Sequence, residues 1–492
     1  MNDTVPYRIP QTWQWAELGD IAEIVRVQVN PQLKPRDKFN YLSIENVEAN
    51  TGELVNFTPS LGKGIKSAKI AFTTGDILYS KLRPYLNKVH LPIFDGISAT
   101  DLIPIRPLGR IQREYLGYFL RTAFVVEYAN QKTRGIQLPR LPVDDLLKLP
   151  VPVAPIPEQG TIVGKIEKGL VEIRAAKRAL RKVRDVIRQF RQSVLARAFR
   201  GDLTDREPSD EPAEKLLEKM RQEHRRGSEE RLQMKAKDPK KYGYESQSMD
   251  VLRLGELPRG WVWTTIAELT DSSFYGPRFA RDEYTQNGVV TIRTTDITDR
   301  GEIVLNNPPR VPLDRDQIEH FGLRDGDLLV ARSGSIGKCS IFEPLGEPAI
   351  PGAYLIRFRL YCRLLPPRYV LYYLLSPMGQ SLLTAAATAV TQANINAEKI
   401  LHFPIPIAPE HEMRRIVSRI QIAQTGADTV EEQVKTTTAS TTLLEQSILH
   451  YAFRGALVQQ NPEDEPASVL LERIRASRTA MGRRENLKRF WR

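Results

Sequence analysis

The stretch PVPVAPIPEQ at residues 150–159 decides the architecture of this chain, because it recurs as PIPIAPEHEM at residues 404–413. The offset of 254 residues continues downstream without a gap, so that AFRG at 198–201 returns as AFRG at 452–455. A long self-similarity at one fixed offset is the signature of an internal duplication. The chain therefore holds two copies of one unit, arranged head to tail.

Upstream of this stretch the two copies are less alike. PQTWQW from Pro10 recurs as PRGWVW from Pro258, at an offset of 248, and GDIL at 75–78 recurs as GDLL at 326–329, at an offset of 251. The changing offset requires insertions or deletions between these landmarks. A divergent part on a shared frame suits variable recognition surfaces, and simple drift of surface loops gives the same pattern. Both explanations stay open at this point.

The front parts of the two copies are predicted to be mixed α and β domains, residues 1–155 and 256–409. The Tyr/Leu/Phe periodicity predicts one helix per copy, at 112–130 and 366–386. Short β-rich runs between Gly, Pro and Asp turn signals predict strands, among them Ile303–Leu305, Asp327–Val330 and Leu355–Phe358. The proline-rich run 149–157 is expected to be an extended, stiff exit from the domain.

The back part of each copy is predicted to be one long helix. After Pro157 the chain reaches Phe199 without another proline, and Gly201 supplies a stop signal. Apolar residues alternate at steps of three and four, which is the seam of a coiled coil. The seam is predicted at Ile173, Leu180, Val183, Ile187, Phe190 and Val194 in the first copy, and at Val430, Val434, Leu444 and Ile448 in the second.

A helix of this length with one narrow apolar stripe needs a partner. At about 1.5 Å per residue, each helix is roughly 60 Å long. If the chain folds back on itself, the two copies pair as an antiparallel coiled coil. The alternative is that each stripe packs on its own front domain, which a helix of this length would outrun.

Charge separates the two long helices. Residues 165–200 carry twelve Lys and Arg against three Asp and Glu, whereas the equivalent residues 419–454 carry three against four. A basic helix face is usually only solvated. A surplus of nine positive charges nevertheless favours contact with phosphate or with an acidic subunit.

A shorter helix is predicted after each long one, near 211–225 and 465–480. Residues 227–250 are polar with almost no apolar spacing, which predicts a linker. The fold class is therefore α+β, with two front domains in a pseudo-two-fold repeat separated by long helices. The predicted parts are 1–155, a helical region 156–226, a linker 227–255, a second front domain 256–409, and a helical region with a basic tail 410–492.

Bulk composition restricts the class of partner. The chain of 492 residues has 71 Lys and Arg against 59 Asp and Glu, a net charge of +12, which favours a polyanion such as nucleic acid. Two cysteines and six scattered histidines give no disulfide framework and no metal-ligand spacing. The N-terminus resembles no signal peptide, and no apolar run reaches the ~18 residues that span a bilayer, so a cytoplasmic, metal-free protein is expected.

No enzyme motif is complete. Asn307-Pro308-Pro309 resembles the Asn-Pro-Pro-aromatic motif of amino-methyltransferases, but Arg310 stands where an aromatic ring must stack the flipped base. The run 334–338 resembles a phosphate loop, but Cys339 stands where Ser or Thr must bind magnesium. The chain is therefore interpreted as non-catalytic.

The order and duplication of these motifs resemble the specificity subunit of type I restriction–modification enzymes. The resemblance covers essentially the whole chain and rests on the Pro-x-x-Trp-x-Trp opening, the Pro-x-Pro-x-x-Pro-x-x-Glu start of each long helix, and Ala-Phe-Arg-Gly at its end. The second copy departs from the family pattern at Glu412-Met413, where Glu-Gln is usual. This departure affects only a local contact at the start of the helix.

The resemblance implies a division of labour. Each front domain would be a target recognition domain that reads one half of a bipartite site in double-stranded DNA. The helices would set the gap between the halves and dock two modification subunits, which bind S-adenosylmethionine and methylate adenine. Restriction subunits would add ATP- and Mg-dependent translocation and cleavage. The chain itself would hold no cofactor and no metal.

Candidate DNA contacts are basic or amide residues in predicted loops, because such side chains bind phosphates and base edges. The loops 134–140 and 388–394 are equivalent by the 254 offset. The candidates in the first domain are Lys63, Lys66, Lys69, Lys81, Arg83, Arg134, Gln137 and Arg140. Those in the second are Arg278, Arg281, Arg293, Arg332, Lys338, Gln392 and Asn394.

Two other functions compete with this interpretation. A coiled-coil assembly scaffold with two adaptor domains predicts no salt-dependent DNA binding. A degenerate stand-alone methyltransferase predicts binding of S-adenosylmethionine by the isolated chain. The DNA sequence and spacer, and the presence of a nuclease partner, do not follow from the residues.

Overall fold

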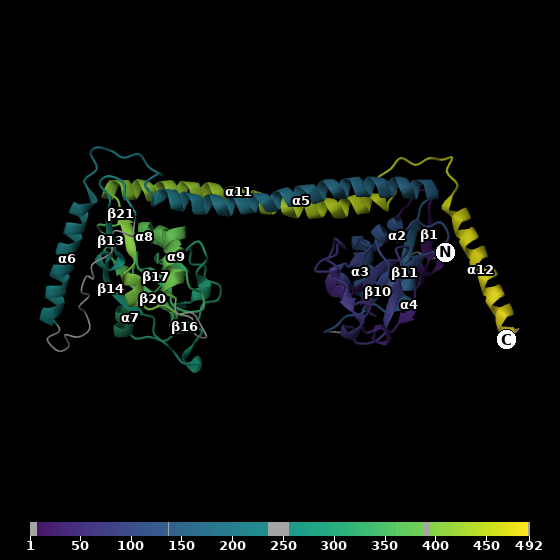
Figure 1. The fold of residues 1–492 in the computed structure, drawn as a ribbon, viewed down its shortest axis with the longest axis horizontal. Helices are drawn as coiled ribbons and strands as arrows, with labels where there is room; N and C mark the ends of the chain where they lie inside the picture. The colour runs from purple at the N-terminus through teal and green to yellow at the C-terminus, as the bar shows by residue number, and fades with distance from the viewer. Residues whose placement is uncertain (1–6, 136, 235–254, 362, 388–393, 491–492) are drawn as a thin grey trace. The chain divides into compact units, whose positions relative to one another are not determined.

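The contacts within the chain divide it into two units that each combine segments far apart in sequence. Unit 1 comprises Met1–Arg181 together with Lys435–Arg492, and unit 2 comprises Lys182–Val434. Each unit thus holds one front domain and a part of both long helices (Figure 1). The computed structural model describes residues 7–135, 137–234, 255–361, 363–387 and 394–490.

Short strands form the front domain of unit 1: β2 (Ala22–Ile24), β3 (Gln28–Val29), β4 (Lys38–Phe39), β5 (Tyr41–Leu42), β6 (Ser60–Leu61), β7 (Lys69–Phe72), β8 (Ile77–Ser80), β9 (Val89–His90), β10 (Gly96–Ser98) and β11 (Leu102–Pro107). Two four-stranded sheets have the orders β2-β11-β8-β9 and β3-β7-β10-β5, and β4 pairs with β6. Neighbours are antiparallel except β5 and β10, which are parallel. The domain is therefore a mixed α and β structure, as predicted.

The front domain of unit 2 follows the same plan with β14 (Thr270–Tyr275), β15 (Val289–Ile292), β16 (Arg310–Val311), β17 (Leu328–Ala331), β18 (Cys339–Ile341), β19 (Ala349–Pro351) and β20 (Leu355–Leu360). The sheets have the orders β14-β20-β17-β18 and β16-β15-β19. The prediction of a strand at Ile303–Leu305 is wrong. Ile303 forms only an isolated bridge with Ile297, because this segment closes a turn rather than joining a sheet.

A buried aspartate fixes the start of the equivalent strands β8 and β17. Asp76 is fully buried and accepts from Arg106 at 2.7 and 2.9 Å, and Asp327 accepts from Arg359 at 3.0 and 2.9 Å. Each aspartate also caps the backbone turn before its strand, through Thr73 N–H in one copy and Arg324 N–H in the other. The Gly-Asp pair found by the repeat is thus a turn anchored by an ion pair.

The helices of the front domains differ from the prediction of one per copy. Unit 1 has α2 (Arg113–Leu120) and α3 (Ala123–Lys132), and unit 2 has α8 (Pro367–Leu375) and α9 (Pro377–Ala386). The break comes from new caps: Thr122 accepts from Val125 N–H, and Ser376 accepts from Gly379 N–H with Pro377 at the first helical position. Shorter helices complete the domains: α1 (Leu18–Ile21), α4 (Val143–Leu147), α7 (Arg315–Phe321) and α10 (Ala397–Leu401).

The proline-rich exits are extended and belong to small sheets, but the predicted extended run 149–157 is too long, because Ile156 and Pro157 already belong to the long helix that follows. β12 (Pro150–Val153) pairs antiparallel with β1 (Gln14–Glu17), and β21 (Pro404–Ile407) pairs with β13 (Val262–Thr265). A two-stranded sheet tolerates the prolines because each strand has a free edge. The first and last strands of each front domain are therefore joined, which closes the domain before the long helix begins.

The long helices are α5 (Ile156–Ala198) and α11 (Glu410–Ala452), each of 43 residues. Gly201 and Gly455 follow them with φ of 78° and 73°, so the stop signal acts through the left-handed conformation that glycine adopts without strain. Among the described residues, no helix is both long enough and apolar enough to cross a membrane.

The two helices run antiparallel within each unit. In unit 1, Lys177 pairs with Glu445 at 2.9 Å, and further toward the start of α5, Lys165 Nζ donates to Leu457 O at 3.0 Å. In unit 2, Arg191 pairs with Asp428 at 2.6 Å and with Glu431 at 2.9 Å, and beyond the end of α5, Thr204 Oγ1 donates to Glu412 near the start of α11 at 3.1 Å. Higher numbers on α5 thus meet lower numbers on α11 in both units.

The end of each long helix packs on the front domain of the other copy. Phe453, at the end of α11, lies 5.1 and 5.2 Å from the rings of Tyr115 and Phe119 in unit 1. Phe199, at the end of α5, lies 5.1 and 5.2 Å from the rings of Tyr369 and Tyr373 in unit 2. The core of unit 1 also includes residues from the start of its own helix, such as Ile162 and Ile166. Each front domain is therefore completed by its own helix start and by the helix end of the other copy.

The predicted seam residues occupy different environments. Ile173, Ile187, Val194 and Val434 are buried, and Leu180 and Ile448 are half-buried. The remaining four are exposed by 36% (Val183), 47% (Phe190), 42% (Val430) and 52% (Leu444). The apolar stripe is thus wider than the contact between α5 and α11 within either unit.

The shorter helices after each long one are confirmed. α6 (Ala213–Met234) begins where Ala213 N–H donates to Gly260 O, and α12 (Ala467–Phe490) begins where Ala467 N–H donates to Thr12 O, both at 2.9 Å. The expected linker is partly wrong, because α6 continues through residues 227–234. Residues 235–254 lie outside the described part of the chain.

A tryptophan–glutamate contact joins each opening motif to its long helix. Trp13 Nε1 donates to Glu158 at 2.9 Å, and Trp261 Nε1 donates to Glu412 at 3.0 Å. Both hydrogen bonds are buried. Burial raises the pKa of the Glu158 carboxyl, and the hydrogen bonds from Trp13 and Gln460 partly offset that rise. The departure at Met413 is accommodated, because its side chain is fully buried in the apolar core.

Candidate nucleic-acid interface

Two predicted loop segments of the first front domain lie side by side. The segment that follows β8 forms an antiparallel bridge between Leu82 and Arg140, and Arg83 N–H donates to Pro139 O at 2.8 Å. Arg83 is exposed and adopts a φ of 50°, which turns the chain sharply at this point. The structure thus brings together candidates that are more than fifty residues apart in sequence.

The charges in this cluster are only partly balanced. Asp101 pairs with Lys81 at 3.6 Å and with Arg140 at 3.2 Å, and Arg134 pairs with Asp145 at 3.6 Å. The side chain of Arg134 is 80% exposed, so its pairing is weak and available for exchange with another anion. The group Lys81, Arg83, Arg134 and Arg140 is called the first basic loop cluster below.

The remaining candidates of the first domain lie elsewhere. Lys63 and Lys66 are exposed in the turn before β7, and Gln137 is exposed beside the first basic loop cluster in sequence. Lys69 lies within β7 and is buried, unlike the exposed loop position expected of it. Its Nζ donates to Ser67 Oγ at 2.8 Å and lies 5.4 Å from the ring centroid of Tyr41.

The second front domain repeats the arrangement at equivalent positions. The segment after β17 forms an antiparallel bridge between Ser333 and Asn394, and Ile395 N–H donates to Arg332 O at 2.9 Å. The offset of 254 relates Asn394 to Arg140, and the offset of 251 relates Arg332 to Lys81. The same pair of loops therefore meets in both copies, with a basic residue directly after the strand.

Other candidates of the second domain are held by their own chain. Arg293 pairs with Asp296 at 2.6 Å, and Lys338 Nζ donates to Ile297 O at 2.7 Å and lies 3.8 Å from Asp299. Arg278 and Arg281 are exposed around a short turn of helix at 281–283. Gln392 lies outside the described residues.

Two residues that matter in these clusters escape the sequence argument. The backbone carbonyl of Asp101 accepts from Lys81 N–H at 2.9 Å. At the equivalent position of the second domain, the carbonyl of Tyr354 accepts from Arg332 N–H at 2.9 Å. Tyr275 carries the guanidinium of Arg332 over its ring, 4.8 Å from the centroid. Neither Asp101 nor Tyr275 is basic or amide-bearing, so a search for DNA-contacting residue types passes over both.

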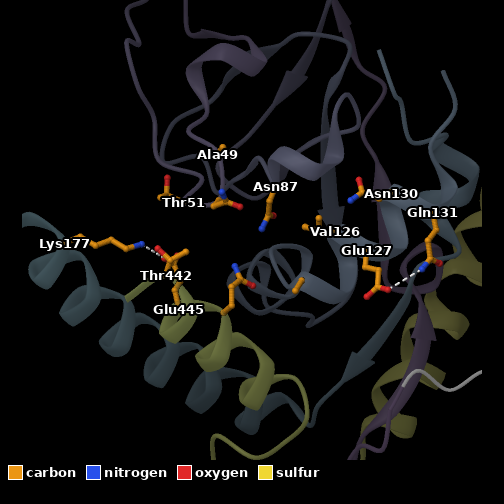
Figure 2. Close-up of a pocket in the computed structure, with 13 residues that line it drawn as sticks. Ala49, Thr51, Asn87, Val126, Glu127, Asn130, Gln131, Lys177, Thr442 and Glu445 are labelled. Carbon is orange, nitrogen blue, oxygen red and sulfur yellow. Dashed lines mark hydrogen bonds and ion pairs between the residues drawn. The ribbon is translucent and has the colours of Figure 1, made fainter. Parts of the chain in front are cut away.

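Two concave sites lie within single units. Figure 2 shows the first, a site of about 840 Å³ in unit 1 between α3, the loop at 49–51 and the two long helices. Lys177 and Glu445 form an ion pair on its wall, and Glu445 also pairs with Arg121 at 3.0 Å. The second site, about 670 Å³ in unit 2, is lined by Thr285, Gln286, Arg293, Asn307, Pro308, Pro309 and Arg310.

The charged side chains that line the two sites have partners within the chain. The walls of the first are mainly amides and hydroxyls, and in the second Arg310 is bound bidentately by Glu347 at 2.7 and 2.8 Å. Burial raises the pKa of the Cys339 thiol to about 12, which leaves it unreactive as a nucleophile. Within the described residues, no group of three or more His, Cys, Asp and Glu is arranged to hold a metal ion.

Comparisons with known proteins point to one family. The family model described as "Type I restriction modification DNA specificity domain" matches residues 258–437. The chain is 32% identical over 223 residues to the Escherichia coli type I restriction enzyme EcoDI specificity subunit, covering 44% of this chain and about half (49%) of that relative. It is 25% identical to the StySPI specificity subunit of Salmonella potsdam over 96% of this chain and 97% of that one.

Two solved structures share the fold. One, from work on complex assembly and conformational transition of the type I R-M system, superposes with a TM-score of 0.68 at 23% identity, covering 92% of this chain and 100% of that one. The HsdS subunit from Thermoanaerobacter tengcongensis superposes with a TM-score of 0.50 at 22% identity, covering 92% and 99%. Two sheet-rich domains with long helices are thus the common architecture.

Proposed function

Because this chain belongs to the specificity subunits of type I restriction–modification systems, we propose that it selects the DNA on which such a complex acts. Each front domain reads one half of a bipartite site in double-stranded DNA. The observation that carries this proposal is the repeated loop pair, Leu82 with Arg140 and Ser333 with Asn394. Two copies of one recognition plan with different side chains suit two different half-sites.

The chemistry of the loops fits this role. Lysine and arginine neutralise phosphates and release condensed counterions, and arginine and asparagine also read base edges in the major groove. The first basic loop cluster presents Arg83 and Arg134 as exposed cations. A surface of this kind binds DNA with an affinity that falls as the salt concentration rises.

The long helices set the gap between the half-sites and dock two modification subunits. Support for docking comes from large apolar side chains that stay exposed on the helices: Val171 (59%) and Leu443 (69%) in unit 1, and Val186 (61%) and Ile422 (66%) in unit 2. Apolar side chains that gather on one exposed surface mark interaction sites, so these residues are where docking is proposed. The modification partners supply S-adenosylmethionine, a restriction partner supplies ATP and Mg, and this chain performs no chemistry itself.

Methylome sequencing tests the recognition role. A host that expresses the chain with its modification partner is expected to gain methylated adenine in a two-part motif with a fixed gap. A matched control expresses the modification partner alone and gains none. If the chain adds no new methylated motif, the proposed function is wrong.

A deletion tests the spacing role. Removal of one heptad from each long helix, residues 180–186 and 436–442, shortens the pair by roughly 10 Å, which is about three base pairs of DNA. The gap in the methylated motif is expected to contract accordingly while both half-sites stay the same. An unaltered gap in a folded deletion variant contradicts the proposal that the helices act as a ruler.

A binding measurement separates the proposal from an assembly scaffold. The complex of this chain with its modification partner is expected to bind duplex DNA that carries the motif, with a steep loss of affinity between 50 and 200 mM salt. A scaffold shows no such DNA binding. Binding of S-adenosylmethionine by the isolated chain would instead favour a methyltransferase.

A further inference from the structure

The residue directly after β17, Arg332, has its backbone fixed on both sides. Its N–H donates to Tyr354 O and its carbonyl accepts from Ile395 N–H, each at 2.9 Å. The next residue, Ser333, is buried and bridges to Asn394. Three segments of the second front domain therefore converge on Arg332 and hold its Cα in place.

The side chain of Arg332 is also oriented. Its guanidinium lies 4.8 Å from the ring centroid of Tyr275, and the hydroxyl of Tyr275 accepts from Ala397 N–H at 2.9 Å. The tyrosine is thus anchored at its hydroxyl, while its ring forms a platform for the cation. An arginine stacked in this way keeps the outer edge of its planar guanidinium available for two parallel hydrogen bonds.

The equivalent position in the first domain shows what is different about Arg332. Lys81 there faces Asp101, and Asp101 is shared with Arg140 at 3.2 Å. Tyr354 occupies in the second domain the backbone position that Asp101 has in the first. No described carboxylate forms an ion pair with Arg332, so its charge is not committed to its own domain.

We propose that Arg332 reads a guanine in the half-site of the second front domain and that Tyr275 is its positioning residue. Guanine presents two acceptors, O6 and N7, on the major-groove edge, and a guanidinium edge matches this pair bidentately. The inference rests on the proposed function and adds to it one base and one residue. A lysine at 332 keeps the positive charge that a phosphate contact requires but loses the planar fork that makes two parallel hydrogen bonds, so R332K weakens a bidentate base contact more than a phosphate contact.

The test is methylome sequencing of hosts that express the modification partner with wild-type chain, R332K, Y275L, Y275F or R315K. Wild type is expected to require guanine at one position of one half-site. R332K is expected to lower the preference for guanine there by about 5- to 150-fold, the range of one bidentate base contact, while the other half-site is unchanged. Y275L is expected to relax the same position, and Y275F, which keeps the ring but loses the hydroxyl that accepts from Ala397 N–H, is expected to relax it less.

R315K serves as the matched control, because Arg315 is an exposed arginine at the start of α7 in the same domain and is not among the candidate DNA contacts. Thermal unfolding of each variant verifies that it is folded. The assignment is overturned if wild type requires no guanine in either half-site, if R332K keeps the guanine preference, or if R332K weakens all positions equally. Absence of any two-part motif with the wild-type chain would instead overturn the proposed function, and this assignment with it.

Discussion

The two units share their apolar plan and differ in the signs of their charges. Lys177 of α5 meets Glu445 of α11 in unit 1, and Arg191 of α5 meets Glu431 of α11 in unit 2. The offset of 254 converts 177 into 431 and 191 into 445, so these are the same two positions of the repeat. Both units therefore keep an ion pair between these two positions, but in each unit the positive residue lies on α5 and the negative residue on α11.

This exchange of signs explains part of the charge imbalance between the long helices. If two copies of α5 paired with each other in the same register, Lys177 would face Arg191, and two copies of α11 would bring Glu431 against Glu445. Like charges at contact distance disfavour such pairs. The duplication has therefore diverged into two complementary helices that favour α5 with α11 over either helix with its own kind.

The largest expected effect tests whether the apolar plan is equivalent in the two units. Phe453→Ala and Phe199→Ala each remove a buried ring that packs on two aromatic rings, and each is expected to cost about 3–5 kcal/mol of unfolding free energy. Hydrogen exchange read by mass spectrometry is expected to show lost protection in unit 1 for Phe453→Ala and in unit 2 for Phe199→Ala. Loss confined to the front domain that precedes the mutated helix would contradict the exchange of helix ends.

The next largest loss of stability is expected from the ion pairs of Glu445 in unit 1, which are more buried than those of Asp428 in unit 2. Glu445→Gln leaves Arg121, only 5% exposed, without its carboxylate, and is expected to cost about 3 kcal/mol. Asp428→Asn is the counterpart in unit 2, where Asp428 is 45% exposed and contacts Arg191 and Arg300, and it is expected to cost at most about 1 kcal/mol. Chemical denaturation measures both, and equal losses would show that burial does not separate the networks.

The repeat explains why much of this architecture is predictable from the sequence. A gapless offset carries any feature of one copy to the other, so the long helices, their glycine stops and the equivalence of the loops at 140 and 394 follow directly. The broken helices α2–α3 and α8–α9 do not follow, because a periodic apolar face continues across the caps at Thr122 and Ser376. Apolar spacing indicates which face is buried and gives no account of local capping.

The sequence does not show which residues a buried helix face packs against. The stripe on α5 predicts that it packs against something, but no local pattern states that Phe199 meets Tyr369. The sequence also does not show which residues lie next to the candidate DNA contacts. The basic residues are recognised by type, whereas Asp101 and Tyr275 acquire their roles only through the loops that the fold brings beside them.

A smaller effect on stability is expected from the ion pairs that join α5 and α11 in unit 2. Arg191→Ala removes the contact with two carboxylates and is expected to cost about 1 kcal/mol, with a smaller loss at high salt because the carboxylates are half exposed. Arg188→Ala is the matched control on the same helix, since Arg188 is 77% exposed and pairs only with its neighbour Asp185 in the described structure. Its expected cost is below about 0.5 kcal/mol. A cost for Arg191→Ala that is independent of salt would assign its effect to packing rather than to charge.

The smallest effect concerns pH and the contact between Trp13 and Glu158. Burial raises the pKa of Glu158, so the folded chain holds this proton more tightly than the unfolded chain does. Its contribution to stability is therefore greatest below the ordinary value of 4.5 and declines as pH rises toward the folded pKa, after which it is constant. Subtraction of the unfolding free energy of Glu158→Gln from that of wild type, at several pH values, is expected to isolate this decline. Glu127→Gln, at an exposed position of the same unit, gives the reference for a carboxyl outside the contact. A difference that instead grows with pH above 4.5 would mean that the hydrogen bonds from Trp13 and Gln460 outweigh burial at this carboxylate.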